Sequence, residues 1–334
     1  MAVLPHTMPI PRISSISPTR AVPGGRLAVH GTGLLTDDGL PVVRLGHERL
    51  RVVFASAREL GVMVTATESG RLPVRVGQTL EPDYVVVGRP LVTGIHQVDS
   101  PVFDRDGRLY VTYSGTRGQQ VPITVFRVTA SGARESFSSV VSNPTSLALA
   151  PDGQLYVSSR FEGAVYRLDA DGSAEVYASD LGIACGLAFA PDGTLFVGDR
   201  SGTIFEVGTN RQTRTFATLP PSVAAFHLAL GTDALYATAP TLSARDAVYR
   251  IAFDGTVSVF HAGFGRPQGL AFGPDGALYV VEALAGVSGL YRVEGEGTST
   301  LVVSGARLVG LAFDAAGDLV LCSSDTAYLV DMHA

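Results

Sequence analysis

The sequence predicts an all-β protein in which a small immunoglobulin-like sandwich precedes a six-bladed β-propeller, whose ring is closed by an N-terminal strand. Three observations predict this class. One unit recurs six times in the larger, C-terminal part of the 334 residues. Short alternating strands with frequent turn signals fill the first 88 residues. No stretch shows convincing helical periodicity.

The repeated unit consists of an apolar run, a turn and a second strand that reads Leu-aromatic-Val in most copies. Clear copies span residues 147–157, 187–197 and 270–280. The leucine of the second strand falls at 109, 155, 195, 235, 278 and 319, so successive copies lie 46, 40, 40, 43 and 41 residues apart. A period of about 40–50 residues built from short strands is typical of a β-propeller, with one blade per copy.

Each copy predicts four strands. The first is apolar without alternation, as expected of an inner strand that is buried on both faces. Pro-Asp-Gly then turns the chain, because proline pre-sets φ, aspartate caps the turn and glycine accepts a positive φ. The third strand carries another aromatic residue, at Phe126, Tyr166, Phe205, Tyr249, Tyr291 and Tyr328. A second turn leads to the outer strand.

The sixth copy ends soon after its third strand, near residues 327–330, so its outer strand is missing from the C-terminal end. A strand-like segment, residues 90–95, stands instead before the first copy. We expect this segment to complete the sixth blade and close the ring, which would remove two free sheet edges.

Residues 1–88 carry a different pattern. Expected strands lie near residues 11–18, 23–34, 42–46, 72–76 and 84–87. The order Ile-x-x-Ile-x-Pro, Pro-Gly-Gly, Gly-x-Gly-Leu and an apolar strand ending in Gly resembles the IPT/TIG family, which implies an immunoglobulin-like sandwich. The predicted organisation is therefore a tail at 1–9, an IPT/TIG domain at 10–88 and the propeller at 89–334.

The repeats resemble the NHL propellers and the related regucalcin/gluconolactonase (senescence-marker-protein) family. The best match is residues 186–199, Gly-Leu-Ala-Phe-Ala-Pro-Asp-Gly-Thr-Leu-Phe-Val-Gly-Asp. The resemblance implies a scaffold and not an activity, because propellers host binders, hydrolases and lyases alike.

Composition excludes several function classes. All 25 cationic residues are Arg and there is no Trp, which rules out Schiff-base and phosphate-loop lysines and Trp-Asp repeats. Residues 1–88 have nine Arg and seven acids (net +2), and residues 89–334 have 16 Arg and 24 acids (net −8), so no basic stripe for nucleic acid is expected. The two cysteines, Cys185 and Cys322, are too few for a disulfide framework.

No apolar run reaches the length of a membrane span, so no membrane partner is expected. The first 20 residues lack a basic region followed by an apolar core, which favours a cytoplasmic location and leaves export open.

Candidate site residues come from the repeat register, because propeller ligands usually meet loops that precede the inner strand or follow the second strand. Small residues precede most inner strands, and His227 is the exception. A functional interpretation makes His227 a metal ligand or a general base near the axis. A structural interpretation, which we favour, makes it a hydrogen-bonded part of the channel wall.

Asp199 and Glu282 are the acids that end second strands. They are candidates to hold a divalent cation such as Ca, Mn or Zn, while turn and inter-blade contacts are the alternative for Asp199. Arg160 and Arg200 follow second strands and suit a carboxylate or phosphate, although inter-blade salt bridges are the favoured interpretation. Asn143 and Gln268 are candidate neutral ligands.

Gluconolactonase-type relatives hold their cation with an early Glu, two Asn and an Asp. Here residues 98–102 read Val-Asp-Ser-Pro-Val without that Glu, and no second Asn starts an inner strand. We therefore expect a propeller that binds a small molecule, sugar or peptide at its channel mouth, with a protein partner at the IPT/TIG domain. A metal-dependent hydrolase or lactonase of gluconolactonase type, or a propeller lyase, is the alternative, so the sequence leaves open whether the chain is an enzyme.

Overall fold

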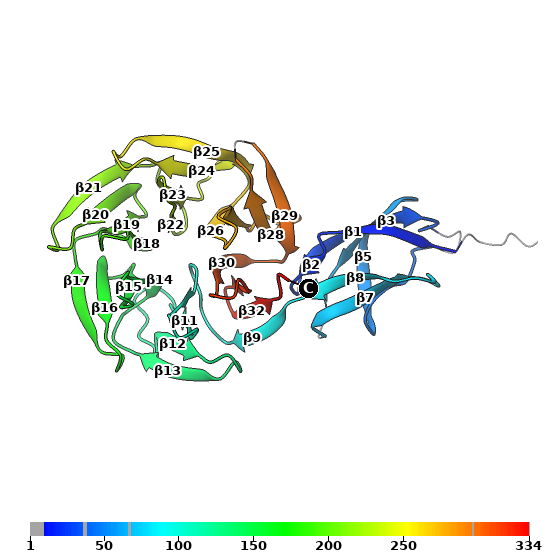
Figure 1. Cartoon of the computed structure of the whole chain (residues 1–334), viewed down its shortest axis with the longest axis horizontal. Helices are drawn as coiled ribbons and strands as arrows, with labels where there is room; N and C mark the ends of the chain where they lie inside the picture. Colours follow the sequence, from blue (N-terminus) through cyan, green and yellow to red (C-terminus); the bar gives the residue numbers. More distant parts are fainter. Residues whose placement is uncertain (1–9, 36–38, 66–67, 296, 334) are drawn as a thin grey trace, which may run out of the picture.

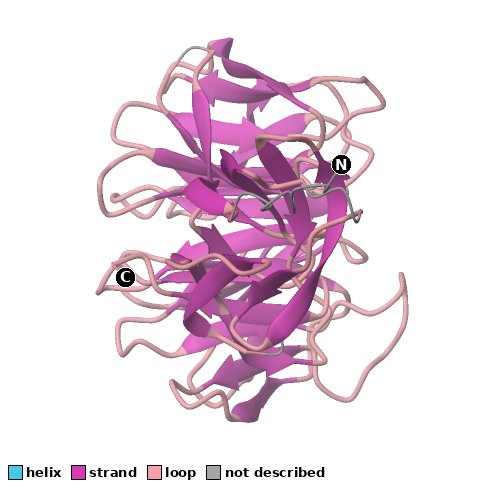
Figure 2. Ribbon diagram, turned by 90° about the vertical axis from the view of Figure 1, so that its right-hand side faces the viewer, coloured by secondary structure: helices cyan, strands magenta, loops and turns pink. Residues whose placement is uncertain are grey.

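The computed structural model describes residues 10–35, 39–65, 68–295 and 297–333, so the predicted tail at 1–9 lies outside the described residues. All regular elements in these ranges are β-strands, as the missing helical periodicity predicted. A ring of sheets stands beside a small sandwich (Figure 1), and the side view is likewise made of strands and loops (Figure 2). No helix in these ranges is long and apolar enough to cross a membrane.

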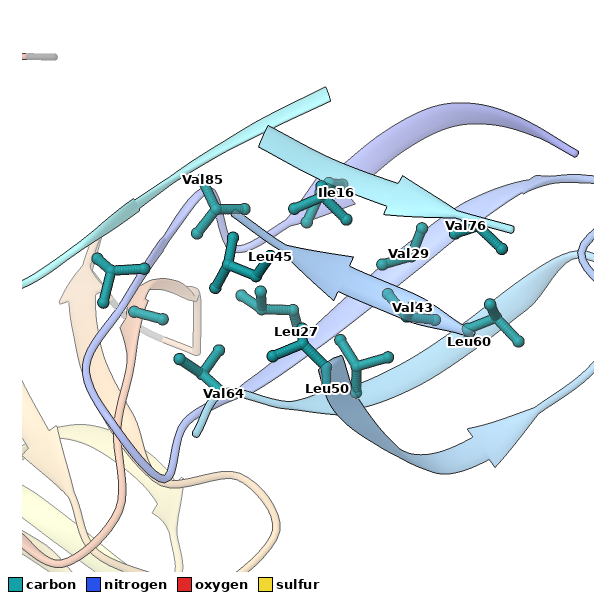
Figure 3. Close-up of a cluster of buried hydrophobic side chains, with 14 of the residues drawn as sticks. Ile16, Leu27, Val29, Val43, Leu45, Leu50, Leu60, Val64, Val76 and Val85 are labelled. Carbon is teal, nitrogen blue, oxygen red and sulfur yellow. The ribbon is translucent and has the colours of Figure 1, made fainter. Parts of the chain in front are cut away.

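The sandwich packs strands around one apolar cluster. Its strands are β1 (Arg12–Ser17), β3 (Arg26–Thr32), β4 (Val43–Leu45), β5 (Glu48–Ala55), β6 (Glu59–Met63), β7 (Gly70–Val76) and β8 (Asp83–Val87). Alternate residues of β3, such as Leu27 and Val29, are buried. They pack in one cluster with Leu45 of β4 and Val76 of β7 (Figure 3). Burial of each large apolar side chain contributes about 1.5–3 kcal/mol, so this cluster is the core of the sandwich.

The repeats fold into four-stranded antiparallel units in which the first strand lies innermost and the last outermost (Figure 1). Separate sheets are formed by β10 (Val102–Phe103), β11 (Leu109–Thr112), β12 (Val125–Val128) and β13 (Arg134–Ser138); by β14 (Pro144–Leu149), β15 (Leu155–Ser159), β16 (Ala164–Leu168) and β17 (Ala174–Ala178); by β18 (Ala184–Phe189), β19 (Leu195–Asp199), β20 (Thr203–Val207) and β21 (Thr213–Thr218); and by β22 (His227–Leu230), β23 (Leu235–Thr238), β24 (Asp246–Ile251) and β25 (Val257–Phe264).

A fifth separate sheet joins distant parts of the chain. It contains β30 (Leu308–Phe313), β31 (Leu319–Ser323), β32 (Thr326–Val330) and β9 (Arg89–Thr93). Strand β9 runs antiparallel to β32, with Thr93 opposite Thr326 and Val92 opposite Ala327. The segment that precedes the first repeat therefore pairs with the last strand of the chain.

The remaining repeat strands belong to a twelve-stranded sheet that runs through both parts of the molecule. They are β26 (Pro267–Phe272), β27 (Leu278–Glu282), β28 (Gly289–Val293) and β29 (Ser299–Ser304). The two-residue strand β2 (Arg20–Ala21) lies parallel to both β8 of the sandwich and β29 of the repeats. Backbone hydrogen bonds therefore continue from the sandwich into the ring of repeats.

The Pro-Gly-Gly segment of the sandwich makes this junction possible. Gly24 has φ +84°, and a Cβ added there would lie 2.8 Å from the Cβ of Ala306. A Cβ on Gly25 would lie 2.5 Å from the carbonyl oxygen of Ser304. Only glycines let the turn approach the repeats this closely. Val22, two residues before Gly24, is buried in an apolar cluster of the repeats.

The predicted turn chemistry is confirmed. The glycines of the first turns, such as Gly153, Gly193 and Gly276, have φ of +92°, +90° and +74°. The second-strand aromatics are buried and pack against aromatics farther out. Tyr156, for example, stacks edge-on with Tyr177 of β17 at 5.0 Å between ring centroids. The Leu-aromatic-Val motif thus supplies packing between the inner and outer strands of a blade.

Candidate functional site

The starts of the inner strands pack tightly around the axis of the ring. Strands β10, β14, β18, β22, β26 and β30 contact one another in this order, and β30 also contacts β10. A Cβ on Gly269 would lie 2.7 Å from the Cα of Gly310, and one on Gly310 would lie 2.5 Å from the Cα of Ser100. This crowding is the reason that glycine or serine stands at most of these positions.

His227 is the one large side chain in that register, and it spans the axis. It begins β22, whereas its partner Asp99 precedes β10, and two inner strands separate β22 from β10 in either direction around the ring. The ring nitrogen Nδ1 lies 2.5 Å from Oδ1 of Asp99. Both residues are buried, with 0% of His227 and 4% of Asp99 exposed. Asp99 also accepts a hydrogen bond from the backbone N–H of Ser100.

This pair matches the structural interpretation of His227, a hydrogen-bonded residue of the channel. The Asp99 carboxylate fixes the orientation of the imidazole through Nδ1. Nε2 is buried and has no hydrogen-bond partner among the described residues. A general-base role for His227 stays a prediction, and the absence of exposed surface means that a substrate could reach Nε2 only after the packing opens.

A cavity of about 330 Å³ lies at one mouth of the channel. Its lining comes from segments that lead into the inner strands and from loops that follow second strands, which is the face that the repeat register indicated. The lining residues are His96, Gln97, Val98, Thr145, Arg160, Ile183, Cys185, Arg200, Val223, Ala224, Ala225, Gln268 and Val309. Three of the four candidate ligand-binding residues, Arg160, Arg200 and Gln268, therefore share one cavity.

The favoured interpretation of the two arginines as inter-blade salt bridges is wrong for the described residues. Neither Arg160 nor Arg200 forms an ion pair there. Arg160 donates from Nη2 to the carbonyl of Gly115 at 3.0 Å, and Arg200 donates to the carbonyls of Ser222 and Val223 at 3.2 and 2.8 Å. They do bridge neighbouring blades, but through neutral carbonyls that leave their charge uncompensated.

The electrostatics of the mouth follow from this arrangement. Burial lowers the pKa of the Arg160 guanidinium, and the positive charges of Arg117 and Arg200 lower it further. Burial, followed by the charge of Arg160, also lowers the pKa of His96. The thiol of Cys185 has its pKa raised to about 12 by burial, so it is a neutral wall residue and not a nucleophile.

Asn143 does not line the cavity. Its side-chain amide donates to the carbonyls of Ser114 and Thr116, and its oxygen accepts the N–H of Gly118 at 2.6 Å. Its φ of +46° suits an asparagine. The side chain is therefore occupied in holding the loop after β11, and a ligand role for Asn143 stays a prediction.

Asp199 and Glu282 end β19 and β27 at equivalent positions, and the structure gives both carboxylates backbone partners. Asp199 accepts the N–H of Ile183 at 2.7 Å and the hydroxyl of Ser201. Each secures the loop that leads into its own blade's inner strand.

Glu282 accepts three backbone N–H groups, from Gly265, Arg266 and Leu284. It borders a separate cavity beside His261. Among the described residues no group of three or more His, Cys, Asp or Glu is arranged to hold a metal ion. The cation proposed for Asp199 and Glu282 stays a prediction, and the two residues are not brought together with His227.

A larger hollow of about 770 Å³ lies between the sandwich and strands β27–β29. Apolar side chains form much of its wall, including Phe54, which is 53% exposed. It contains no cluster of reactive groups like that at the channel mouth. The predicted protein partner at the sandwich stays a prediction.

Two residues of the channel were not among the predicted site residues. Gln97 lines the cavity, and Asp99 appeared only within the Val-Asp-Ser-Pro-Val segment that lacks the Glu of the gluconolactonase-type relatives. The signal for Asp99 was its position one residue before Ser100, which stands in the register of His227. Pairing across the ring brings together residues 128 positions apart, and the repeat pattern carries no information on such contacts.

The fold and the site define a class: a β-propeller joined to a small sandwich, with a cavity at one mouth of its channel that has apolar walls and a few polar groups. Residues 11–86 match the IPT/TIG domain family, which confirms the predicted resemblance of that part of the chain. No curated protein shows significant sequence similarity to this chain.

Solved structures support the propeller. A gluconolactonase from Xanthomonas campestris is 15% identical, with 88% of this chain and 98% of that chain covered and a TM-score of 0.61. An auxiliary nutrient binding protein from Bacteroides thetaiotaomicron is 14% identical over 96% of this chain and 97% of that one, with a TM-score of 0.56. Virginiamycin B lyase from Staphylococcus aureus is 18% identical over 67% and 76%, with a TM-score of 0.51. At these identities the likeness shows the fold alone, so the NHL and regucalcin assignments stay predictions.

Proposed function

We propose that this chain binds a small molecule in the cavity at the channel mouth. One observation carries the proposal: Arg160, Arg200 and Gln268 line the same cavity of about 330 Å³, together with the segments that lead into the inner strands. That volume lies at the lower end of the range for small-molecule sites, which combine apolar walls with a few placed polar groups. The neighbour named as a nutrient binding protein is consistent with such a role.

The proposal also depends on the ring being complete. We infer that strands β26–β29 of the long sheet are a blade like the five separate sheets, which gives six blades, and that β9 closes the ring. The pairing of β9 with β32 and the succession of contacts between inner strands support this inference. We place the domain boundary between residues 88 and 89.

A tryptophan introduced at the mouth tests the proposal, because the natural chain contains none and the new residue would be the only indole. Ala224 lines the cavity, so Ala224→Trp reports on its occupancy. Phe253 lies beyond the end of β24, on the opposite face of the ring, and is 53% exposed, so Phe253→Trp is the matched control.

The two variants are titrated with sugars, organic acids, phosphorylated metabolites and short peptides. We expect at least one compound to shift the emission of Ala224→Trp in a saturable way without changing that of Phe253→Trp. The same compound should raise the melting temperature of the unmodified chain. If no compound class produces either effect, or if both variants respond alike, small-molecule binding at the mouth is wrong.

The metal-dependent hydrolase or lyase is the second candidate. One observation favours it: a buried histidine that is oriented by a carboxylate and whose Nε2 has no partner among the described residues resembles the arrangement of a general base. Metal analysis of the purified chain, followed by a lactone-hydrolysis screen with Ca²⁺, Mn²⁺ or Zn²⁺, tests it. Stoichiometric metal that is lost in Glu282→Gln, together with turnover, would favour the enzyme over the pure binder.

A further inference from the structure

We propose that the channel-mouth cavity is an anion site, in which Arg160 and Arg200 receive the carboxylate or phosphate group of a small organic molecule. This inference rests on the proposed small-molecule binding and adds the chemical class of the ligand. It is carried by three independent features of the mouth: unpaired cations, unsatisfied donors and a lining without carboxylates.

The two arginines of the mouth lack the ion pairs that several other arginines of the repeats form. Arg127 pairs with Glu135 at 2.7 Å, Arg214 with Glu206 at 2.7 Å and Arg292 with Asp275 at 2.9 Å. Arg160 and Arg200 form no such pair with any described residue. The cavity is therefore lined by two guanidinium groups whose charge no carboxylate among the described residues neutralises.

This arrangement is electrostatically costly without a ligand. Arg160 is partly buried, and its Nε is enclosed without a hydrogen-bond partner in the described residues. Like charges on Arg200 and Arg117 are near enough to affect it. Loss of part of a cation's hydration without a counter-charge is unfavourable, so an anion in the cavity would offset the partial desolvation of Arg160 and the repulsion from its neighbours. Guanidinium groups also match carboxylate and phosphate oxygens in a planar, bidentate geometry.

Gln97 supplies a further donor. Its oxygen accepts the backbone N–H of Thr112 at 2.8 Å, which fixes the orientation of the amide. The Nε2 group is consequently the free end, and it has no acceptor among the described residues although the side chain is 1% exposed. Gln97 is a lining residue of the cavity, and a buried N–H donor without a partner is unfavourable, so an anion's oxygen is an acceptor that this group lacks.

The lining itself contains no Asp or Glu. Two carboxylates, Asp99 and Asp199, are close enough to act on the lining residue Cys185. Both are buried and already hydrogen-bonded, Asp99 with His227 and Ser100 and Asp199 with Ile183 and Ser201. The lining therefore contains cationic and neutral hydrogen-bond donors but no carboxylate that would compete with a bound anion. This pattern selects against metal cations and favours oxyanions.

The test uses the full chain in a low-salt buffer free of phosphate and carboxylates. Isothermal titration is run with succinate and citrate as carboxylates, with inorganic phosphate and glycerol 3-phosphate as phosphates, and with glucose and glycerol as uncharged compounds. Comparison of the first two arms identifies which oxyanion is preferred. We expect binding in at least one of them, no binding of the uncharged compounds, and weaker binding as NaCl is added.

Arg160→Gln and Arg200→Gln should each weaken binding of that anion at least tenfold, since hydrogen bonds to charged groups are among the strong ones. Arg214→Gln, which removes an arginine from a surface ion pair, is the matched control and should leave binding unchanged. If Arg160→Gln is poorly folded by circular dichroism, Arg160→Lys keeps the charge without the planar fork and should retain part of the affinity.

A second readout comes from His96, whose pKa is lowered partly by Arg160. A bound anion offsets that charge, so the imidazole pKa measured by proton NMR should rise on binding. If an uncharged compound binds the mouth and no anion does, the anion site is wrong while small-molecule binding stands. If Ala224→Trp responds to nothing at all, both are wrong. If anions bind equally well to the glutamine variants, the assignment to these arginines is wrong.

Discussion

Substitution of His227 by leucine tests the cross-channel hydrogen bond. The change removes the Nδ1 donor but roughly keeps the side-chain volume, so Asp99 stays buried with only the N–H of Ser100 as a partner. Removal of one member of a buried pair costs about 3–5 kcal/mol, because an uncompensated charge is left behind. We expect a loss of stability of that size for His227→Leu.

Two further variants separate the lost bond from damage to packing. Asp99→Asn keeps an oxygen for Ser100 and leaves no buried charge, so it should cost about 1 kcal/mol. The double variant Asp99→Asn/His227→Leu should be more stable than His227→Leu alone, since the stranded carboxylate is gone. Arg214→Gln breaks a surface pair whose arginine is 68% exposed, and should cost less than about 1 kcal/mol.

The free energy of unfolding is measured by urea titration followed with far-ultraviolet circular dichroism, which needs no tryptophan. A cost below about 1 kcal/mol for His227→Leu would refute the reasoning about a buried, compensated pair. Strictly additive effects in the double variant would refute it as well, because additivity means that the two side chains do not interact.

Three other outcomes follow from the described contacts. Gly310→Ala places a Cβ 2.5 Å from the Cα of Ser100 and should lower stability by about 1–3 kcal/mol in thermal unfolding; an unchanged melting temperature would contradict the tight packing at the axis. Val22→Asp buries an unpaired polar group in the repeats' apolar cluster and should cost about 3 kcal/mol or more, with faster proteolysis near the junction; equal protease resistance would speak against a joined core. Arg160→Gln should raise the pKa of His96 while leaving it below its ordinary value, because burial persists, and an unchanged NMR titration would mean that Arg160 does not act on it.

Much of the fold was accessible from sequence because local chemistry determines it. Pro-Asp-Gly fixes a turn, and the second-strand leucine and aromatic residue set the register of a blade. The same register indicated the face on which Arg160, Arg200 and Gln268 meet. In the sandwich, by contrast, β5 and β6 were not predicted. Strand β5 alternates poorly, with both Val53 and Phe54 exposed, so it lacks the period-two signal of a half-buried strand.

The parts of the site that sequence could not provide depend on three-dimensional closure. Whether Arg160 meets a carboxylate or the carbonyl of Gly115 depends on the course of a loop in another blade. The contact between Asp99 and His227 depends on how many units separate them around the ring. The spacing of residues within one repeat predicts neither the course of a loop in another blade nor the contact between two distant repeats.

The twelve-stranded sheet has a mechanical consequence. From β1 at the edge of the sandwich to β26 at the ring's centre, strands are linked laterally by backbone hydrogen bonds, and β26 begins at Pro267 beside the cavity residue Gln268. A load applied to the sandwich is therefore carried by a continuous β-structure toward the channel and not by a flexible tether. The narrowest part of that path is β2, two residues long and paired through Ala21 with Ser304. Under tension, the hydrogen bonds between β2 and β29 should break first, while the sheets of the ring stay folded.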